Sequence, residues 1–326
     1  MKPVGRTVKP VGRIGVEAIR AARPRIAGTA IRSPLLALDV PGAPCELWVK
    51  LECLQPISSF KVRGATNALA LADPAHIARG VYTGSAGNMA QGLALAARRL
   101  GVPCRVVVPA TAPRNKLDAI ARLGATAVPL PFDEWWNVLR DHGHPSEDGH
   151  FVHPVSDPAV IAGNGTVGLE IVEDLPDVRA VVVPYGGGGL SCGIAAAVRP
   201  GVPVFAAEVE TAAPFAAALN AGCPVEVSHT HSFVDGIGST RVLDEMWPLA
   251  SASLAGSRVV SLEDACTAIR VLFERGRVVA EGAGGTSVAA ALKGLPGIGE
   301  GPVVAVVSGG NIDAGVLRKI LEGRMP

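Results

Sequence analysis

Short apolar segments alternate along the chain with longer segments in which apolar positions recur every three or four residues. The short segments are rich in β-branched residues, and we predict strands over 47–51, 80–83, 105–108, 125–129, 180–184, 204–208 and 303–307. Unbroken apolar runs such as AVVVP at 180–184 are typical of central parallel strands that are covered on both faces. The alternation therefore predicts an α/β protein with mainly parallel sheets.

Two helices between these strands have clear ends. Residues 88–100 carry apolar side chains at helical spacing, and Gly101 follows as a fitting C-terminal residue. Residues 114–123 end in the same way at Gly124. The pattern breaks down over residues 132–152, where we predict polar turns that lead to a lobe boundary, and it resumes near residue 157.

Composition and charge limit the kinds of molecule that this protein is expected to bind. The 326 residues carry a formal net charge of +1, which gives no electrostatic reason to expect a nucleic acid or an anionic membrane as partner. No apolar run is long enough to span a bilayer, and the basic N-terminus, with its repeated KPVGR, reads as a flexible arm. The six cysteines form no CxxC pair, which favours buried free thiols. We therefore expect a cytoplasmic protein.

Four segments of small residues stand at the ends of strand-like runs or the starts of helix-like ones. Open α/β sheets bind ligands at the carboxyl ends of their strands, so these segments are expected to surround one site. The segments are PISSFKVRGA at 56–65, GSAGN at 84–88, PYGGGGLS at 184–191 and VSGGN at 307–311.

Each segment offers a different chemistry. Lys61 has apolar neighbours that can lower the pKa of its amine and make it a nucleophile, although a solvated surface lysine is the alternative. Backbone N–H groups with Ser85 and Asn88 can hold a carboxylate, or these side chains can simply cap a helix. Glycine costs about 1 kcal/mol relative to alanine in a helix, so the run 186–189 favours a loop that grips a phosphate. Ser308 can hydrogen-bond a ligand heteroatom, or belong to an ordinary turn.

In combination, the segments resemble the fold-type II pyridoxal 5′-phosphate (PLP) enzymes, which share the tryptophan synthase β-like fold. The resemblance runs from about residue 33 to residue 313 and is strongest to the threonine and serine dehydratases, the branch that is related to serine racemases. The segments that carry it are SSFKVRGATNAL, GSAGNMAQGLALAARRLG, HPVSDPAVIAGNGTVGLEI, EGAGGTSVAA and SGGNID.

The resemblance implies roles for individual residues. Lys61 would hold PLP as a Schiff base and act as the catalytic base, Gly186 to Leu190 would bind the phosphate, and Ser308 would face the pyridine nitrogen. The implied cofactor-binding residues are Phe60, Lys61, Asn88, Gly186, Gly187, Gly188, Gly189, Leu190, Gly236, Glu281, Ser308 and Gly309. The implied substrate-binding residues are Ser59, Ser85, Ala86, Gly87, Asn88 and Met89.

The same resemblance implies two lobes, each with a mainly parallel twisted sheet flanked by helices. A large PLP-binding lobe would comprise residues 1–74 and 153–326, and a small lobe with the substrate loop would comprise residues 75–152. A homodimer without a C-terminal regulatory domain is expected.

The implied reaction is β-elimination, in which a small β-hydroxy amino acid such as threonine or serine gives a 2-oxo acid and ammonia. Racemases of this group carry a serine where this chain has Ala86, so racemisation is the weaker alternative. Met89 and Val155 depart from the common pattern and leave a specialised substrate open, such as 3-hydroxyaspartate or a β-aryl serine. No arginine can be placed to bind a second carboxylate.

The sequence also bears on metal binding and on two other classes of function. Glu208 is a weak cation ligand candidate because Pro214 stands where related proteins have an aspartate, and no metal is expected. The pairs His142/His144 and His229/His231 lack zinc spacing and are expected to be solvated. A nicotinamide-dependent oxidoreductase is the main rival, but Ser191 interrupts the glycine fingerprint that such enzymes need. A non-catalytic amino-acid sensor on the same fold is the second.

Overall fold

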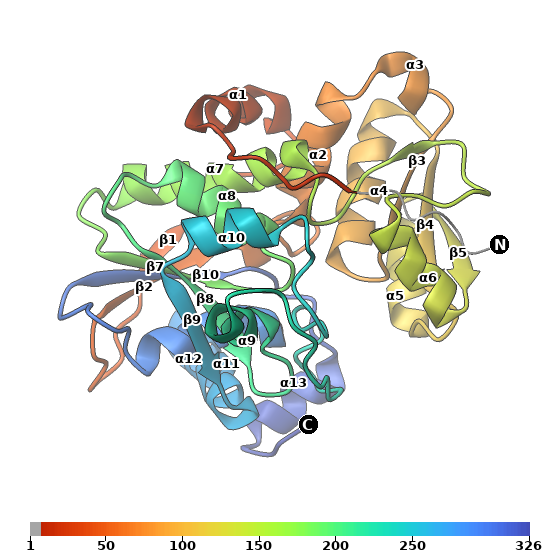
Figure 1. The fold of residues 1–326 in the computed structure, drawn as a ribbon. Coiled ribbons are helices and arrows are strands. Elements are labelled where there is room, and N and C mark those ends of the chain that lie inside the picture. Colours follow the sequence, from red (N-terminus) through yellow and green to blue (C-terminus); the bar gives the residue numbers. More distant parts are fainter. Residues whose placement is uncertain (1–7) are drawn as a thin grey trace.

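The computed structural model describes residues 8–326, and it has two lobes that lie side by side (Figure 1). The larger lobe is built on a six-stranded sheet in the order β1-β2-β10-β7-β8-β9, in which only β1 is antiparallel to its neighbour. The smaller lobe is built on a four-stranded, fully parallel sheet in the order β5-β4-β3-β6. The predicted α/β class with mainly parallel sheets is confirmed.

The strands are short and apolar. Those of the larger sheet are β1 (Leu35–Ala37), β2 (Glu46–Leu51), β7 (Ala180–Pro184), β8 (Val204–Val209), β9 (Gly256–Val260) and β10 (Pro302–Val307). Those of the smaller sheet are β3 (Val81–Gly84), β4 (Cys104–Pro109), β5 (Thr126–Leu130) and β6 (His150–Phe151). All seven predicted strands are present, and β1, β6 and β9 are additional.

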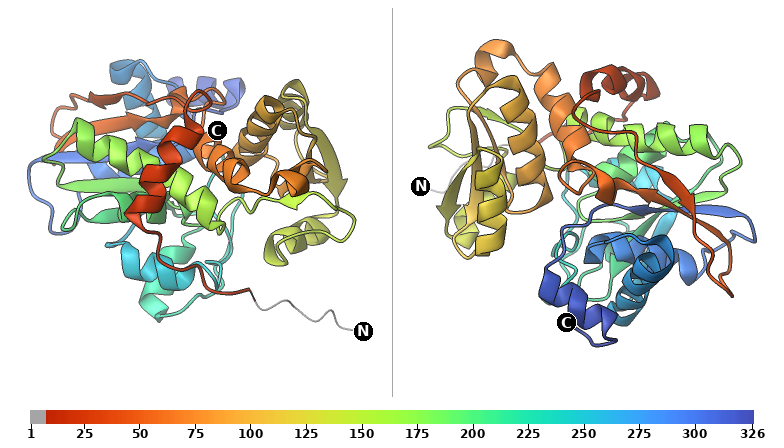
Figure 2. Two further views of the ribbon diagram at one scale, coloured as in Figure 1. Left: turned by 90° about the horizontal axis from the view of Figure 1, so that it is seen from above. Right: turned by 180° about the vertical axis from the view of Figure 1, so that it is seen from behind.

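Helices cover both faces of each sheet (Figure 2). In the larger lobe they are α1 (Val16–Ile26), α7 (Pro158–Asp174), α8 (Gly189–Ala197), α9 (Pro214–Ala221), α10 (Trp247–Ser253), α11 (Leu262–Gly276), α12 (Gly282–Leu292) and α13 (Ala314–Leu321). In and beside the smaller lobe they are α2 (Lys61–Leu71), α3 (Pro74–Ile77), α4 (Asn88–Leu100), α5 (Arg114–Arg122) and α6 (Phe132–Arg140), and a short 3-10 turn, η1 (Glu52–Leu54), precedes α2.

Alternation along the central strands divides the core of the larger lobe into two layers. Val181 and Val183 of β7 face the layer that contains α1, α7 and α8, whereas Ala180 and Val182 face the layer that contains α11 and α12. Side chains are buried on both sides of the sheet, which explains why the strand reads as an unbroken apolar run. Helix α2 packs against α7 of the larger lobe and α4 of the smaller one, so it connects the two cores.

Three expectations from the sequence need correction. Residues 132–140 form helix α6, whose Val138 and Trp135 pack under the smaller sheet, so the predicted loss of regular structure is wrong there. The second KPVGR copy is not a free arm, because Val11 is buried and its N–H donates to the Glu245 carbonyl. The first copy, at residues 2–6, lies outside the described residues. All six cysteines are free, but Cys223 is exposed and Cys45 is only half-buried.

The strands of each sheet come from distinct parts of the chain. Those of the smaller sheet lie between residues 81 and 151, and those of the larger sheet come from either side of that segment. The lobe limits at residues 74 and 153 stay a prediction. No helix within residues 8–326 is both long and apolar enough to cross a membrane.

Candidate active site

A cleft of about 330 Å³ lies where β3, β7 and β10 end. Most of the residues singled out from the sequence line it together. They are Phe60, Lys61, Ser85, Ala86, Gly87, Asn88, Met89, Gly186, Gly187, Gly188, Gly189, Leu190, Gly236, Glu281 and Ser308. The four small-residue segments therefore meet at one site, and helices α2, α4, α8 and α12 all begin at or beside it. The positive ends of four helix dipoles favour an anionic ligand in this cleft.

Lys61 is the first residue of α2, and its partly buried side chain lines the cleft. Its Nζ donates a hydrogen bond to the Pro154 carbonyl oxygen at 2.7 Å and lies 5.2 Å from the centre of the Phe60 ring. Burial without a carboxylate partner lowers the pKa of Lys61 to about 8. About one tenth of this lysine is therefore a neutral amine at pH 7, which is the form that can attack a carbonyl carbon or accept a proton.

The glycine run 186–189 leaves β7 and opens α8 with unused backbone donors. The N–H groups from Gly186 to Leu190 have no hydrogen-bond acceptor within residues 8–326. Gly188 has a φ of +92°, a conformation that favours glycine. A Cβ on Gly189 would lie 2.8 Å from the Val155 carbonyl oxygen, so this position has no room for a side chain. Free donors on a side-chain-free backbone at a helix N-terminus fit a phosphate group.

A second set of free donors begins α4. The Ser85 N–H is bound to the Val107 carbonyl and the Gly87 N–H to the Ser85 hydroxyl. The N–H groups of Ala86, Asn88 and Met89 have no acceptor in the described part of the chain. This turn can therefore bind a carboxylate through backbone donors, with Ala86 contributing no side-chain proton.

Asn88 connects the smaller lobe to the larger one. Its Nδ2 donates to both carboxylate oxygens of Glu281, at 2.9 and 3.2 Å, and its Oδ1 accepts from Asn311 Nδ2 at 2.7 Å. Burial, reinforced by the negative charge of Asp235, raises the pKa of Glu281 to about 7 despite the hydrogen bond from Asn88. The Ser308 hydroxyl faces the cleft and has no partner within residues 8–326, so it is free to meet a ligand.

Two of the predicted site residues lie behind the cleft wall. Ser59 is fully buried, and its hydroxyl accepts from the Lys61 N–H at 3.4 Å. Gly309 pairs with Ser59 through a β-bridge, and a Cβ on Gly309 would lie 2.4 Å from Glu281 Oε1. Neither residue lines the cleft, but each contacts a residue that does.

The structure adds residues that the sequence did not assign to the site. Pro154 supplies the carbonyl that holds Lys61, and Lys116 and Asp235 line the cleft as an ion pair. Trp135 of α6 also lines it. Its buried Nε1 has no hydrogen-bond partner within residues 8–326. Pro154, Lys116 and Trp135 lie outside the four small-residue segments, and Asp235 is next to the predicted residue Gly236 but was not itself assigned a role.

Glu208 does not reach the cleft. Its carboxylate accepts the N–H groups of Phe215 and Ala216, both at 2.8 Å, and therefore caps helix α9. Burial raises its pKa. These two hydrogen bonds give Glu208 a structural role at the start of α9.

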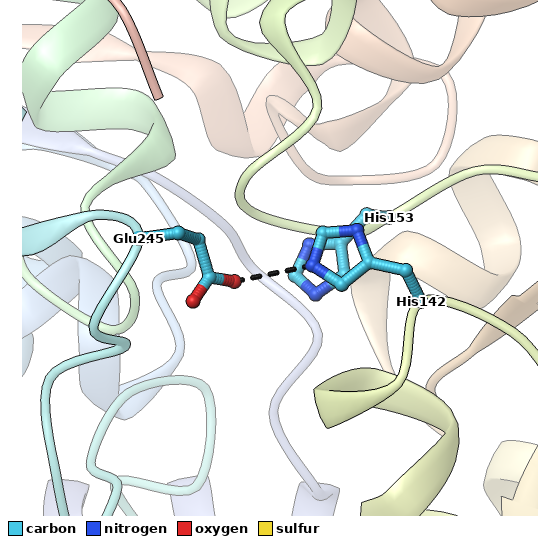
Figure 3. Close-up of side chains that lie close together, drawn as sticks. All are labelled: His142, His153 and Glu245. Atoms are coloured by element: carbon cyan, nitrogen blue, oxygen red, sulfur yellow. Dashed lines mark hydrogen bonds and ion pairs between the residues drawn. The ribbon is translucent and has the colours of Figure 1, made fainter. Parts of the chain in front are cut away.

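The histidines divide into exposed and packed ones. His229 and His231 are exposed, as expected, but His142 and His144 are half-buried, which corrects the expectation that this pair is solvated. His142 stacks on His153 at 4.4 Å and its Nε2 lies 3.2 Å from Glu245 Oε1 (Figure 3). The three side chains bring possible metal-ligand atoms within 4.8 Å of one another. His153 Nδ1, however, accepts the N–H groups of Val155 and Ser156, which favours a hydrogen-bonded turn.

Comparison with known proteins gives a consistent result. The family model described as "Pyridoxal-phosphate dependent enzyme" matches residues 26–309. The L-threonine ammonia-lyase of Thermotoga maritima is 40% identical over 312 residues, which cover 94% of this chain and 77% of that protein. The tomato (Solanum lycopersicum) threonine deaminase isoform 2 structure matches with a TM-score of 0.86 and 30% identity, covering 99% of this chain and 94% of that one. The maize serine racemase structure matches with a TM-score of 0.87 and 29% identity, covering 96% and 98%.

Proposed function

This chain belongs to the family of pyridoxal-phosphate dependent enzymes, and from that membership we propose that it removes water and ammonia from a small β-hydroxy amino acid, with L-threonine as the main substrate. The products would be a 2-oxo acid and ammonia. The arrangement of Lys61 between two sets of free backbone donors, one suited to a phosphate and one to a carboxylate, carries the proposal.

The chain's own residues fit the cofactor. We propose that Gly186 to Leu190 hold the phosphate, that Ser308 faces the ring nitrogen and that Asn88 contacts the ring oxygen. When bound, PLP supplies an electron sink for the charge that develops at the substrate Cα. Serine lacks the negative charge that keeps a ring nitrogen protonated, so this sink is moderate and suits prompt loss of a β-leaving group.

Lys61 is the proposed proton acceptor. Its amine is fixed at the cleft by the Pro154 carbonyl, and its lowered pKa of about 8 leaves a useful fraction uncharged at neutral pH. The N–H groups of Ala86, Asn88 and Met89 would orient the substrate carboxylate. With the carboxylate fixed at α4, the Lys61 Nζ can take the proton from Cα on one face.

Ala86 favours elimination over racemisation. Racemisation needs a second proton donor on the face of Cα that is opposite to Lys61, and the alanine methyl group cannot donate one. Serine racemase remains the second candidate because the maize enzyme matches this fold over nearly its whole length. Elimination requires no proton from position 86.

A substrate panel tests the proposal. Purified PLP-loaded protein is incubated with L-threonine, L-serine, threo-3-hydroxyaspartate and a β-aryl serine, and 2-oxo acid, ammonia and the D-enantiomer are each measured. We expect 2-oxobutyrate and ammonia in equal amounts from L-threonine, with L-serine slower. Formation of D-serine without ammonia would replace the lyase with the racemase, and no turnover of any substrate would support a sensor.

The proposal includes three finer points that derive from the sequence resemblance. These are a homodimer, a cytoplasmic location and the division of the chain into lobes at residues 74 and 153. Light scattering on the purified protein tests the first, and limited proteolysis tests the third.

A further inference from the structure

An ion pair crosses the cleft between the two lobes. Lys116 lies on α5 of the smaller lobe, and Asp235 lies in the long loop of the larger lobe that precedes α10. Lys116 Nζ and Asp235 Oδ2 are 2.6 Å apart. Both residues line the cleft, and their side chains are 33% and 48% exposed, so the pair is accessible to a ligand as well as to solvent.

Few charged groups line this cleft. Within residues 8–326 they are Lys61, Lys116, Asp235 and Glu281. Lys61 has a role in the proposed chemistry, and Glu281 is engaged by Asn88. Lys116 is thus the one cation of the lining that is left to attract an anionic group on a substrate side chain. Asp235 both neutralises Lys116 and presents a negative charge of its own.

We propose that Lys116 and Asp235 set the charge specificity of the site: Lys116 is positioned to receive a second carboxylate of a substrate, and Asp235 excludes dicarboxylic amino acids by occupying Lys116 and repelling that carboxylate. This inference rests on the proposed lyase function and names its substrate class, the uncharged β-hydroxy amino acids. Specificity is a difference between affinities, and a repulsive charge produces it without improving contacts to the preferred substrate. The methyl group of threonine is uncharged, so the Lys116–Asp235 pair does not repel it.

The first test compares substrates. The kcat/KM values for L-threonine and threo-3-hydroxyaspartate are measured for the wild type, Asp235→Asn, Lys116→Gln and the double variant. We expect Asp235→Asn to raise the ratio of hydroxyaspartate to threonine by about tenfold, the scale of one close charge pair. The double variant is expected to lose this gain, because Lys116 is what the second carboxylate would bind.

The second test does not depend on turnover. Binding of succinate and of butyrate, which differ in one carboxylate, is measured by calorimetry with the PLP-loaded protein. Asp235→Asn is expected to tighten succinate binding by about tenfold and leave butyrate unchanged, and the effect is expected to shrink at high salt. If the wild type releases no ammonia, the proposed lyase function fails, and the succinate result still decides the role of the pair.

Asp118→Asn is the matched control. Asp118 lies on α5, as Lys116 does, pairs with exposed Arg114 and is absent from the cleft lining. The substitution Asp118→Asn therefore removes one negative charge near Lys116 in sequence but outside the cleft. We expect it to change neither ratio. Equal effects of Asp118→Asn and Asp235→Asn, or a gain that persists when Lys116 is also removed, would overturn the inference.

Discussion

Gly187 faces the Val155 side chain with no room for a methyl group between them. A Cβ on Gly187 would lie 2.5 Å from Val155 Cγ1 and 2.7 Å from Val155 Cγ2. Val155 follows the carbonyl that holds Lys61, so this contact places the proposed phosphate loop against the lysine.

Gly187→Ala is therefore expected to displace the loop and weaken PLP binding by at least about tenfold, as overpacking does elsewhere. Val155→Ala in the same chain removes the two nearest methyl groups and is expected to restore much of the affinity. The measurement is the dissociation constant for PLP from an absorbance titration. Gly299→Ala, at an exposed glycine with open space around it, is the control, and a similar loss there would contradict the steric account.

Arg63 connects two buried carboxylates. It donates to Glu52 at 2.7 Å and to Glu170 at 2.6 Å, and Glu170 also meets Lys50 Nζ at 2.7 Å. Arg63→Met would leave these carboxylates without their shared partner, so we expect the free energy of unfolding to fall by about 3–5 kcal/mol. Urea unfolding measures it.

The matched control for Arg63 is an exposed pair. Arg114, whose side chain is 88% exposed, contacts Asp118 at 3.1 Å, and its replacement by Met is expected to cost less than about 0.5 kcal/mol. Equal losses of stability for the two variants would show that burial does not increase the contribution of the Arg63 network to the free energy of unfolding.

His153 predicts a pH dependence of stability. Burial, together with the nearby His142, lowers its pKa to about 3, while Glu245 opposes this shift. The unfolded chain takes up a proton near pH 6.5 and the folded one does not, so stability is lost as the pH falls from 6.5 toward 3. The loss from one such site is at most about 1.4 kcal/mol per pH unit.

Asn in place of His153 keeps an acceptor for the N–H groups of Val155 and Ser156 but cannot titrate. We expect the midpoint of thermal unfolding of His153→Asn to fall less steeply than that of the wild type between pH 6.5 and pH 4. Replacement of exposed His76 by Asn is the control. An unchanged slope in His153→Asn would assign the acid sensitivity to other groups.

The sequence predicts the parts of the site that local pattern encodes. Lys61, the glycine run 186–189 and Ser308 each follow from the need for a small-residue turn at the end of a strand, and parallel strands bring such turns to one edge. The helix 88–100 has the predicted limits because Gly101 adopts a φ of +69° at its C-terminus.

What the sequence does not indicate depends on packing between distant segments. Lys116 belongs to an ordinary amphipathic helix, and its position in the cleft opposite Asp235 depends on how the two lobes pack together. Trp135 lies in a stretch whose polar residues hide the helical period of α6. No apolar pattern in the sequence predicts that Arg63 is buried. Its burial depends on ion pairs with Glu52 and Glu170, which lie on two other elements. The lobe limits and the residue roles stay predictions.

The central claim is that Lys61 carries the cofactor. Protein purified with ample PLP is reduced with borohydride, digested, and mapped by peptide mass spectrometry. We predict a pyridoxyl adduct on the peptide that contains Lys61 and none on Lys50 or Lys116. An adduct on another lysine, or no adduct at all on the PLP-saturated protein, would contradict it.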